Sequence, residues 1–391
     1  MPDREDEDDN SREPVRSRDG RFAPSTRRTR DRARPVDRSH VVQAALLAEL
    51  GRFEVRDLHD PRPGRGELLV RVQACGVCGS DLRIFRHGHP RIRLPQVLGH
   101  EIVGTVVGTG RDANGFRPGD RVAVMPKVPC GNCLYCRRGR GNLCAEGGSF
   151  GYQLPGGFAE YVVVPQAAVN QDVVLPLPAD FDTEEAVLIE PLACCLRSHL
   201  RGEGAQDECV VVIGGGPVGT IHGRLARHRN AALVILVERS EGRLASADRR
   251  TFHVVIDSQR EEPVEAVRRH SEGRSADHVI VACSSREAQV QALAMVAKGG
   301  RVDFFAGLPP GAEPIALDTN RLHYQEVTIR STHGSTADDC REALGLLASG
   351  ELVLGDIVTG RYALSHIQEA FDALERQEVS KAVVKPMEAR E

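Results

Sequence analysis

The stretch Cys209-Val-Val-Val-Ile-Gly-Gly-Gly-Pro-Val-Gly219 decides the fold of the second half of this chain. Its first five residues form an apolar run rich in valine and isoleucine, which is typical of a buried strand in a parallel sheet. The Gly-x-Gly-x-x-Gly turn follows at once, and a helix is expected to start near Pro217. A second strand, residues 233–238, ends in the acid Glu238 about 20 positions further on. Together these features predict a dinucleotide-binding site, with a tight turn that binds nothing as the plainer alternative.

The residues of this turn suit a dinucleotide cofactor for separate physical reasons. Gly214, Gly216 and Gly219 let the backbone approach a pyrophosphate, and the N-terminus of the following helix stabilises its charge. Glu238 can accept hydrogen bonds from ribose hydroxyls and repels a 2′-phosphate, so NAD is favoured. Arg239 could accommodate that phosphate instead, which leaves NADP as the alternative cofactor.

Further along the chain, apolar runs alternate with helical segments, and this alternation predicts a doubly wound parallel sheet. The runs are residues 254–256, 278–282 and 301–305, and the helical segments are residues 261–270 and 286–297. After Gly334 the chain is expected to return to the first domain. The expected elements of that return are helices near residues 338–348 and 365–376 and a last strand at residues 382–384.

Before Pro178, short β-rich runs separated by Pro and Gly predict an all-β, barrel-like domain. The stretch from Cys78 to Glu101 is expected on loops of this domain, and residues 179–202 read as a helical connector. Residues 1–38 mix acids and arginines with almost no apolar side chains, so this tail is predicted to be disordered. The β-rich runs are residues 41–47, 53–55, 67–72, 102–108, 121–125 and 159–164.

The loops of the first domain carry Cys78, His100 and Glu101, three accepted types of zinc ligand. Three protein ligands leave one coordination position open for chemistry. A buried Cys and a surface His would explain the same residues without a metal. Glu190 lies just before Pro191 in an apolar run, where a carboxylate is costly unless a metal or a substrate pairs with it. A Glu-Pro pair that breaks a helix at the surface is the other interpretation.

Four further cysteines form the strongest local pattern in the sequence. Cys130, Cys133, Cys136 and Cys144 have C-x2-C-x2-C-x7-C spacing, which lets four thiolates close around one zinc ion. Four soft ligands with no open position make this a structural site. An iron–sulfur cluster is the rival, because four thiolates suit it too, and disulfides or free thiols are the remaining alternatives.

Length and composition limit what else the chain can be. Its 391 residues suffice for two domains, and the net charge of −4 gives no electrostatic case for nucleic acid or a membrane. No apolar run reaches the roughly 18 residues that span a bilayer, and the N-terminus lacks an apolar signal-peptide core, so a cytoplasmic protein is expected. The eleven cysteines are spaced like metal ligands, which fits a reducing compartment.

Taken together, these residues resemble the zinc-dependent medium-chain alcohol dehydrogenase superfamily over residues 40–388. Glu190-Pro191 makes the chain similar to the polyol (sorbitol) and threonine dehydrogenase branch. The resemblance implies a GroES-like β-barrel catalytic domain at residues 39–185, with the four-Cys loop at 129–146, a Rossmann domain at 186–334, and a return to the catalytic domain at 335–391. The matching pieces are Cys78-Gly-Ser80-Asp81, Gly99-His100-Glu101, the four-Cys loop, Glu190-Pro191-Leu192, and Gly214 to Gly219 with Glu238.

The resemblance also implies roles for single residues. Cys78, His100 and Glu101 would hold a catalytic zinc, with Glu190 near the metal and Asp81 supporting the site. The family commonly places a His five residues after the metal Cys to relay the proton, but this position is Arg83 here, and arginine stays protonated. Ser80 is therefore expected to take the alcohol proton. The residues that match cofactor positions are Gly214, Gly216, Val218, Gly219, Glu238, Arg243, Ala306, Gly307, Leu308, Thr332 and His333.

The activity that the resemblance implies is reversible hydride transfer from a secondary alcohol to NAD, giving the ketone, with two zinc ions per chain. The alcohol would be a polyol, a cyclitol, an aminocyclitol or a sugar alcohol. An L-threonine, amino-alcohol or butanediol-type dehydrogenase is the alternative within this class. A non-catalytic NAD-binding redox sensor or structural protein is the alternative of another class. Relatives form dimers or tetramers, so a homo-oligomer is expected.

Overall fold

In the computed structural model, β11 (Cys209–Ile213) lies in the middle of a six-stranded sheet with the order β13-β12-β11-β14-β15-β16. Each pair of neighbouring strands in this sheet is parallel. The strand order reverses at β11, and open parallel sheets bind their ligands at the carboxyl ends of the strands where such a reversal occurs. The other strands are β12 (Leu233–Glu238), β13 (Val254–Asp257), β14 (Ala276–Val281), β15 (Val296–Phe304) and β16 (Thr328–Arg330).

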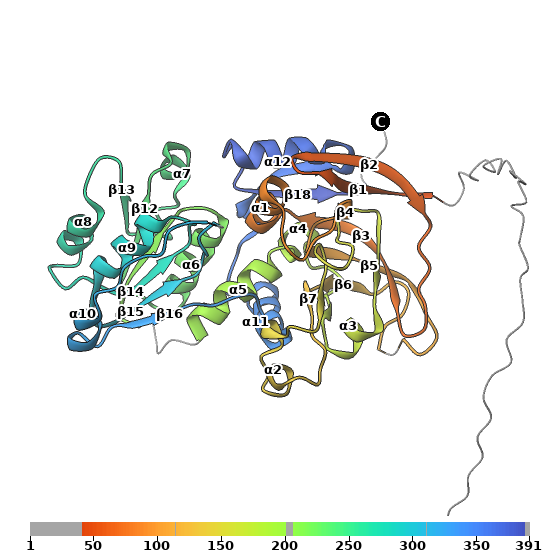
Figure 1. Ribbon diagram of the computed structural model, residues 1–391, viewed down its shortest axis with the longest axis horizontal. Coiled ribbons are helices and arrows are strands. Elements are labelled where there is room, and N and C mark those ends of the chain that lie inside the picture. Colours follow the sequence, from red (N-terminus) through yellow and green to blue (C-terminus); the bar gives the residue numbers. More distant parts are fainter. Residues whose placement is uncertain (1–40, 114, 201–205, 310, 388–391) are drawn as a thin grey trace, which may run out of the picture. The chain divides into compact units, whose positions relative to one another are not determined.

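Helices cover both faces of this sheet (Figure 1). Val210 and Val212 pack in one hydrophobic cluster with Ala226 of α6, whereas Val211 and Ile213 pack in another with residues of α8 and α9. Because alternate side chains of a strand point to opposite faces, both faces of β11 must be apolar, and this explains its uninterrupted apolar sequence. The helices of this part are α6 (Pro217–His228), α7 (Glu241–Ser246), α8 (Pro263–His270), α9 (Arg286–Met295) and α10 (Thr319–Tyr324).

The rest of the described chain forms the predicted β-rich domain, in which two sheets carry most of the strands. One sheet has the order β2-β1-β4, and the other has the order β10-β6-β5-β3-β18-β17, with β9 paired to β3. The strands are β1 (Val41–Glu49), β2 (Arg52–His59), β3 (Leu68–Gly76), β4 (Gln96–Val97), β5 (Glu101–Thr109), β6 (Arg121–Val124), β7 (Lys127–Val128), β8 (Gly148–Ser149), β9 (Tyr161–Val164), β10 (Val174–Pro176), β17 (Val358–Ala363) and β18 (Lys381–Lys385).

The C-terminal segment contributes strands to the larger of these two sheets. β18 pairs with β3 in antiparallel fashion, with Val384 opposite Cys75. The two helices expected after Gly334 are present as α11 (Ala337–Ala348) and α12 (Ile367–Glu375). The remaining α-helices are α2 (Leu134–Arg137), α3 (Gln166–Asn170), α4 (Thr183–Ala186) and α5 (Ile189–Leu200), of which α4 and α5 lie within the expected connector.

One expectation for this domain was wrong. The stretch from Cys78 to Glu101 is not all loop, because residues Gly79–His87 form helix α1. Cys78 is its N-cap, and the Asp81 carboxylate accepts a hydrogen bond from the Cys78 backbone N–H at 3.0 Å, which completes a capping box. Its apolar face consists of the buried Ile84 and Phe85 and the partly buried Leu82, and the charged residues around them hide this short amphipathic pattern.

The structure describes residues 41–113, 115–200, 206–309 and 311–387. The tail predicted for residues 1–38 lies outside these residues. All described residues belong to one compact unit, His40–Glu391. None of the described helices is both long and apolar enough to cross a membrane.

Candidate active site

Strand pairing brings Cys78, His100 and Glu101 together. β3 ends at Gly76, directly opposite Glu101 at the start of β5, so the loops that carry Cys78 and His100 start from neighbouring strands. One sulfur, nitrogen or oxygen atom from each of the three residues lies within 4.8 Å of the others. Gly76 is required here, because a Cβ at this position would lie 1.9 Å from Glu101 Oε2.

Asp81 fixes the orientation of His100. One carboxylate oxygen of Asp81 lies 3.2 Å from His100 Nδ1, and the other accepts the N–H of Cys78. His100 Nδ1 therefore donates to the carboxylate, which leaves Nε2 as the nitrogen able to bind a metal. Both His100 and Asp81 are buried, so this orientation is held by packing as well as by the hydrogen bond.

The Glu101 carboxylate has a partner that sequence reasoning missed. The Lys381 ammonium, on β18, lies against both carboxylate oxygens and donates to Oε1 at 2.6 Å. Oε2 is buried and also contacts the Lys381 ammonium as an ion pair, although it makes no hydrogen bond within the described residues. A thiolate, an imidazole nitrogen and a buried carboxylate fit zinc and leave a position open.

Of the two residues predicted to act beside this trio, Ser80 lies next to His100, whereas Glu190 does not add a ligand atom to the trio. Ser80 Oγ is 3.4 Å from His100 Nε2, the nitrogen that Asp81 leaves free. Glu190 lies in the first turn of α5 and is not one of the residues whose ligand atoms gather within 4.8 Å. Its carboxylate accepts from Cys194 Sγ at 3.4 Å, and burial raises its pKa.

The four cysteines of the loop after β7 also converge. Their sulfurs lie within 4.8 Å of one another, with Cys130 and Cys136 at 3.9 Å and Cys133 and Cys136 at 3.4 Å. Sulfurs on a tetrahedron with Zn–S bonds of about 2.3 Å would be about 3.8 Å apart, so the site has the size for zinc. All are free thiols rather than disulfides. Burial alone would raise the pKa of Cys144, but hydrogen bonds, chiefly from the N–H of Cys130, lower it to about 6.

The predicted nucleotide turn has the backbone that its glycines suggest. Gly214 has φ of +106°, a left-handed conformation, and Gly216 is the N-cap of α6. A Cβ on Gly219 would lie 1.8 Å from the Gly214 carbonyl oxygen, so only glycine allows this close approach. The carboxylate of Glu238 accepts the backbone N–H of Gly215 at 2.6 Å and of Arg239 and Ser240 at 2.7 and 2.8 Å.

A cavity of about 630 Å³ opens beside this turn and fits a nucleotide. Glu238 and Arg243 line it, and Arg243 Nη1 lies 3.8 Å from Glu238 Oε2. Val218 is half-buried in the first turn of α6 and does not line this cavity. Gly214 and Ser284 also line it.

The remaining predicted cofactor residues follow β15 and β16. Ala306 donates its backbone N–H to the Val281 carbonyl at 3.0 Å, at the carboxyl end of β14, and Gly307 and Leu308 continue that loop. Thr332 Oγ1 is buried without a hydrogen-bond partner in the described part of the chain. These residues do not line the 630 Å³ cavity, so their role is still a prediction.

Known proteins with the same sequence features decide the family. The alcohol dehydrogenase GroES-like domain matches residues 64–179, and the zinc-binding dehydrogenase domain matches residues 217–349. An L-galactonate-5-dehydrogenase of Escherichia coli is 31% identical over 83% of this chain and 93% of its own length. This chain belongs to the zinc-binding alcohol dehydrogenase family.

Other members of the zinc-binding alcohol dehydrogenase family match over similar lengths. A sorbitol dehydrogenase of Halalkalibacterium halodurans is 29% identical over 86% of this chain and 97% of its own. An L-threonine 3-dehydrogenase of Pyrococcus furiosus is 32% identical over 84% of this chain and 94% of its own. The chain is thus a zinc-dependent oxidoreductase of the alcohol dehydrogenase type.

Solved structures agree with this assignment. A dehydrogenase of Sinorhizobium meliloti, solved bound to NADP, has a TM-score of 0.82 and 29% identity over 88% of this chain and 99% of its own. An alcohol dehydrogenase of Escherichia coli, solved with NADH, has a TM-score of 0.80 and 25% identity over the same shares. The GroES-like and Rossmann folds and the use of zinc and a nicotinamide cofactor are therefore established for this family member.

Three features of this zinc-binding dehydrogenase were not predicted from the sequence. Tyr152 packs its ring 6.0 Å from the His100 ring and 5.2 Å from the His89 ring, so it forms one wall near the predicted catalytic zinc. Lys381 pairs with Glu101 across 280 residues of sequence. Its rarity was the one available signal, because only four lysines occur in the chain. The third feature is the contact between Arg83 and Ser284.

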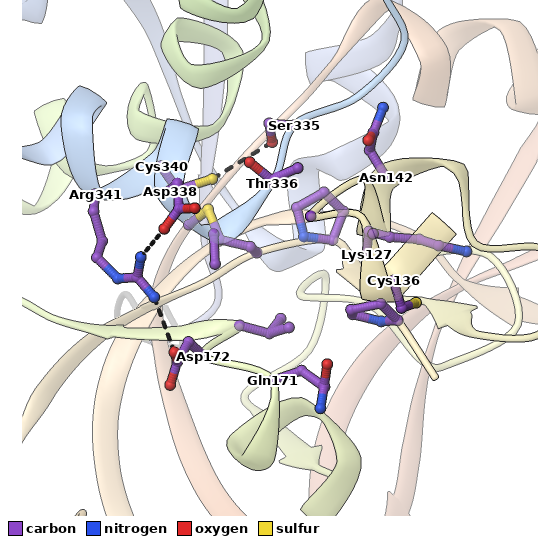
Figure 2. A pocket seen from close by; sticks show the side chains of 17 residues that line it. Lys127, Cys136, Asn142, Gln171, Asp172, Ser335, Thr336, Asp338, Cys340 and Arg341 are labelled. Atoms are coloured by element: carbon purple, nitrogen blue, oxygen red, sulfur yellow. Dashed lines mark hydrogen bonds and ion pairs between the residues drawn. The ribbon is translucent and has the colours of Figure 1, made fainter. Parts of the chain in front are cut away.

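A second cavity, of about 240 Å³, lies between the four-Cys loop and the start of α11 (Figure 2). Arg341 reaches from α11 to both Asp338 and Asp172 on one side of it. On the other side Asn142 donates its amide to the His333 carbonyl at 2.8 Å. This contact ties the four-Cys loop to a segment that sequence reasoning assigned to the cofactor.

Proposed function

We propose that this protein oxidises a secondary alcohol of a polyol, a cyclitol, an aminocyclitol or a sugar alcohol to the ketone, reversibly, with NAD as hydride acceptor. The observation that carries this proposal is the convergence of Cys78, His100 and Glu101, which leaves a coordination position open for a substrate. Relatives that act on L-galactonate and sorbitol support a substrate with several hydroxyl groups.

The proposed reaction removes two hydrogens from the alcohol, a hydride from the carbinol carbon and a proton from the hydroxyl, and each has its own acceptor. Bound zinc would supply a Lewis acid that lowers the pKa of the substrate hydroxyl, and NAD would accept the hydride from the carbinol carbon. Ser80, whose Oγ lies 3.4 Å from His100 Nε2, relays the hydroxyl proton in this proposal: Oγ accepts it while the serine's own proton leaves. The serine's proton passes to water or a ribose hydroxyl, because Arg83 cannot act as a base.

Glu190 and Glu101 have different tasks in this proposal. Glu101 is a third metal ligand that also pairs with Lys381, whereas Glu190 contacts the metal or the substrate from α5. Burial raises the pKa of Glu190, which means that its charged form is costly in the protein alone. A nearby metal ion or substrate would compensate this charge, and this supports the proposed position of Glu190 beside one of them.

The cofactor, the assembly and the compartment complete the proposal. Glu238 favours NAD, because a buried carboxylate at the end of β12 repels a 2′-phosphate. We infer a homo-oligomer in the cytoplasm, on the resemblance to dimeric and tetrameric relatives. The chain would divide into a catalytic domain at 39–185, a Rossmann domain at 186–334 and a catalytic return at 335–391.

Zinc content and a substrate screen on one preparation test this function. We expect two zinc ions per chain and NADH formation with at least one polyol, cyclitol or sugar acid. One zinc held by the four-Cys loop, with NAD bound and no turnover, would instead favour a non-catalytic NAD-binding protein.

An L-threonine or amino-alcohol dehydrogenase is the second candidate. The Pyrococcus furiosus relative named for that activity, 32% identical, favours it. Threonine, 2,3-butanediol and aminocyclitols belong in the same screen. Turnover of threonine with a kcat/KM far above that of any polyol would replace the first proposal by this one.

A further inference from the structure

Arg83 stands where the family commonly has a proton-relay histidine, and its side chain points elsewhere. Arg83 lies in the middle of α1 and is exposed. Its Nη2 donates to the hydroxyl of Ser284 at 3.3 Å, across 201 residues of sequence. Arg83 therefore reaches from the GroES-like part of the chain to the loop after β14 of the Rossmann sheet.

Ser284 places this guanidinium at the nucleotide cavity. Ser284 lines the 630 Å³ cavity together with Gly214 and Glu238. Gly214 begins the turn that leads to the N-terminus of α6, where backbone N–H groups attract a pyrophosphate. The guanidinium thus lies on the rim of the cavity on which the phosphates of a dinucleotide would lie.

The charges around the cavity leave Arg83 available for an anion. Arg243 also lines the cavity, but it lies 3.8 Å from the Glu238 carboxylate, which offsets its charge. Arg86, one turn further along α1, is bound by both oxygens of Glu375. In the described part of the chain, Arg83 makes no ion pair with a carboxylate, and the Ser284 hydroxyl is the acceptor found for it.

We propose that Arg83 is a cofactor-binding residue that donates hydrogen bonds to the pyrophosphate of the nicotinamide dinucleotide. This inference rests on the proposed function, because it assumes that the cavity binds NAD. A guanidinium presents a planar fork of N–H groups that matches phosphate oxygens, and it retains its charge at any pH of interest. The position that relays a proton in relatives would here hold the cofactor, which is consistent with Ser80 acting alone on the proton.

Two variants of Arg83 and one neighbouring control test the proposal by binding rather than by turnover. Arg83→Gln removes the charge, Arg83→Lys keeps it without the fork, and Arg93→Gln removes an exposed charge from the loop after α1. NADH binding is followed by its fluorescence and ADP-ribose binding by calorimetry. Adenosine, which has no phosphate, is measured by competition with NADH.

We expect Arg83→Gln to raise the Kd of NADH and of ADP-ribose about tenfold or more, since one charged hydrogen bond is lost. Arg83→Lys should lie between this variant and the wild type, and Arg93→Gln should match the wild type. The inhibition constant of adenosine should not change in any variant.

Other results would overturn the proposal. Unchanged Kd values for NADH and ADP-ribose in Arg83→Gln would show that Arg83 does not contact the pyrophosphate. An equal loss of adenosine binding would show a general disturbance of the cavity instead. If the wild type bound neither NADH nor ADP-ribose, the proposed function would fail together with this inference, and the two failures are therefore distinguishable.

Discussion

The buried ion pair of Lys381 with Glu101 is the residue-level feature that most changes the description of the metal site. Both side chains are at most 4% exposed, so neither charge is compensated by water. In the proposed site this carboxylate would serve two cations, the lysine and a bound zinc ion. The lysine therefore pairs with the buried carboxylate whether or not a metal ion is bound, and it competes with zinc for Glu101.

We predict that Lys381→Met destabilises the zinc-free protein by about 3–5 kcal/mol, because it leaves an uncompensated buried carboxylate. The zinc-loaded protein should lose much less, since the metal ion then compensates Glu101. Urea unfolding of both forms measures the two losses, with the exposed Lys298→Met as the control. Equal losses in the two forms would contradict a role of Glu101 at the metal.

Glu238 has two tasks that a substitution should separate. Its carboxylate holds three backbone N–H groups of the nucleotide turn, and it repels a 2′-phosphate. We predict that Glu238→Gln retains part of the turn and raises the ratio of kcat/KM for NADP to that for NAD about tenfold or more, because a repulsion of roughly 1.4 kcal/mol corresponds to tenfold. Initial rates with both cofactors measure it, and an unchanged ratio would mean that other residues select the cofactor.

Among the elements, the four-Cys loop is the one whose folding we expect to depend on a metal ion. Its helix α2 (Leu134–Arg137) has no buried residue, and a 3-10 turn at Gly141–Leu143 is the one other helical piece of the loop. Segments of this length do not form stable structure in water on their own. If the four sulfur atoms hold zinc as proposed, that ion would be the main support of the loop, besides the contact of Asn142 with His333.

We predict that Cys133→Ser removes one zinc ion per chain and leaves the loop open to trypsin at Arg137 to Arg140. The reciprocal variant Cys78→Ser should also lose one zinc ion, but its loop should resist trypsin as the wild type does. Zinc analysis and mass spectrometry of the tryptic fragments measure both. Trypsin resistance of Cys133→Ser after zinc loss would show that the loop folds without its metal.

In the molecule as a whole, three buried histidines make the free energy of unfolding depend on pH. His199 Nε2 lies 3.1 Å from His222 Nδ1, and the His278 ring centroid lies 5.8 Å from that of His199. Burial lowers the pKa of all three, that of His222 to about 3, and nearby arginines lower the pKa of His199 and His278 further. The folded protein therefore holds these side chains neutral, between α5, α6 and β14.

The direction of the pH effect follows from proton binding. In the unfolded chain these histidines have a pKa of about 6.5, so below that pH the unfolded state binds more protons than the folded state. Their contribution is fully present above about pH 6.5 and falls as the pH drops toward 3, by up to about 1.4 kcal/mol per pH unit for each histidine. The slope of the unfolding free energy against pH measures how many protons the chain takes up on unfolding. Between pH 6 and 5, His222→Gln should reduce this number by about one, relative to the wild type and to the exposed His87→Gln. Urea unfolding at several pH values measures it, and equal slopes would contradict the neutral state of His222.

The sequence by itself determined the features that depend on short spacing. The strand, turn and helix at Cys209 to Gly219, the four-Cys loop, and the types of metal ligand at Cys78, His100 and Glu101 follow from local chain geometry. Such spacings restrict which atoms can meet, whatever the rest of the chain does. The family was predictable from them, and the comparisons confirmed it.

Only the tertiary structure decided which distant residues complete the sites. Lys381 reaches Glu101 because β18 and β5 both pair with β3, and Arg83 reaches Ser284 because α1 and the loop after β14 meet. Helix α1 itself was not predicted from the sequence, since its apolar face consists of only Leu82, Ile84 and Phe85. These contacts depend on strand register and on packing between elements far apart in the chain, and no local pattern encodes either.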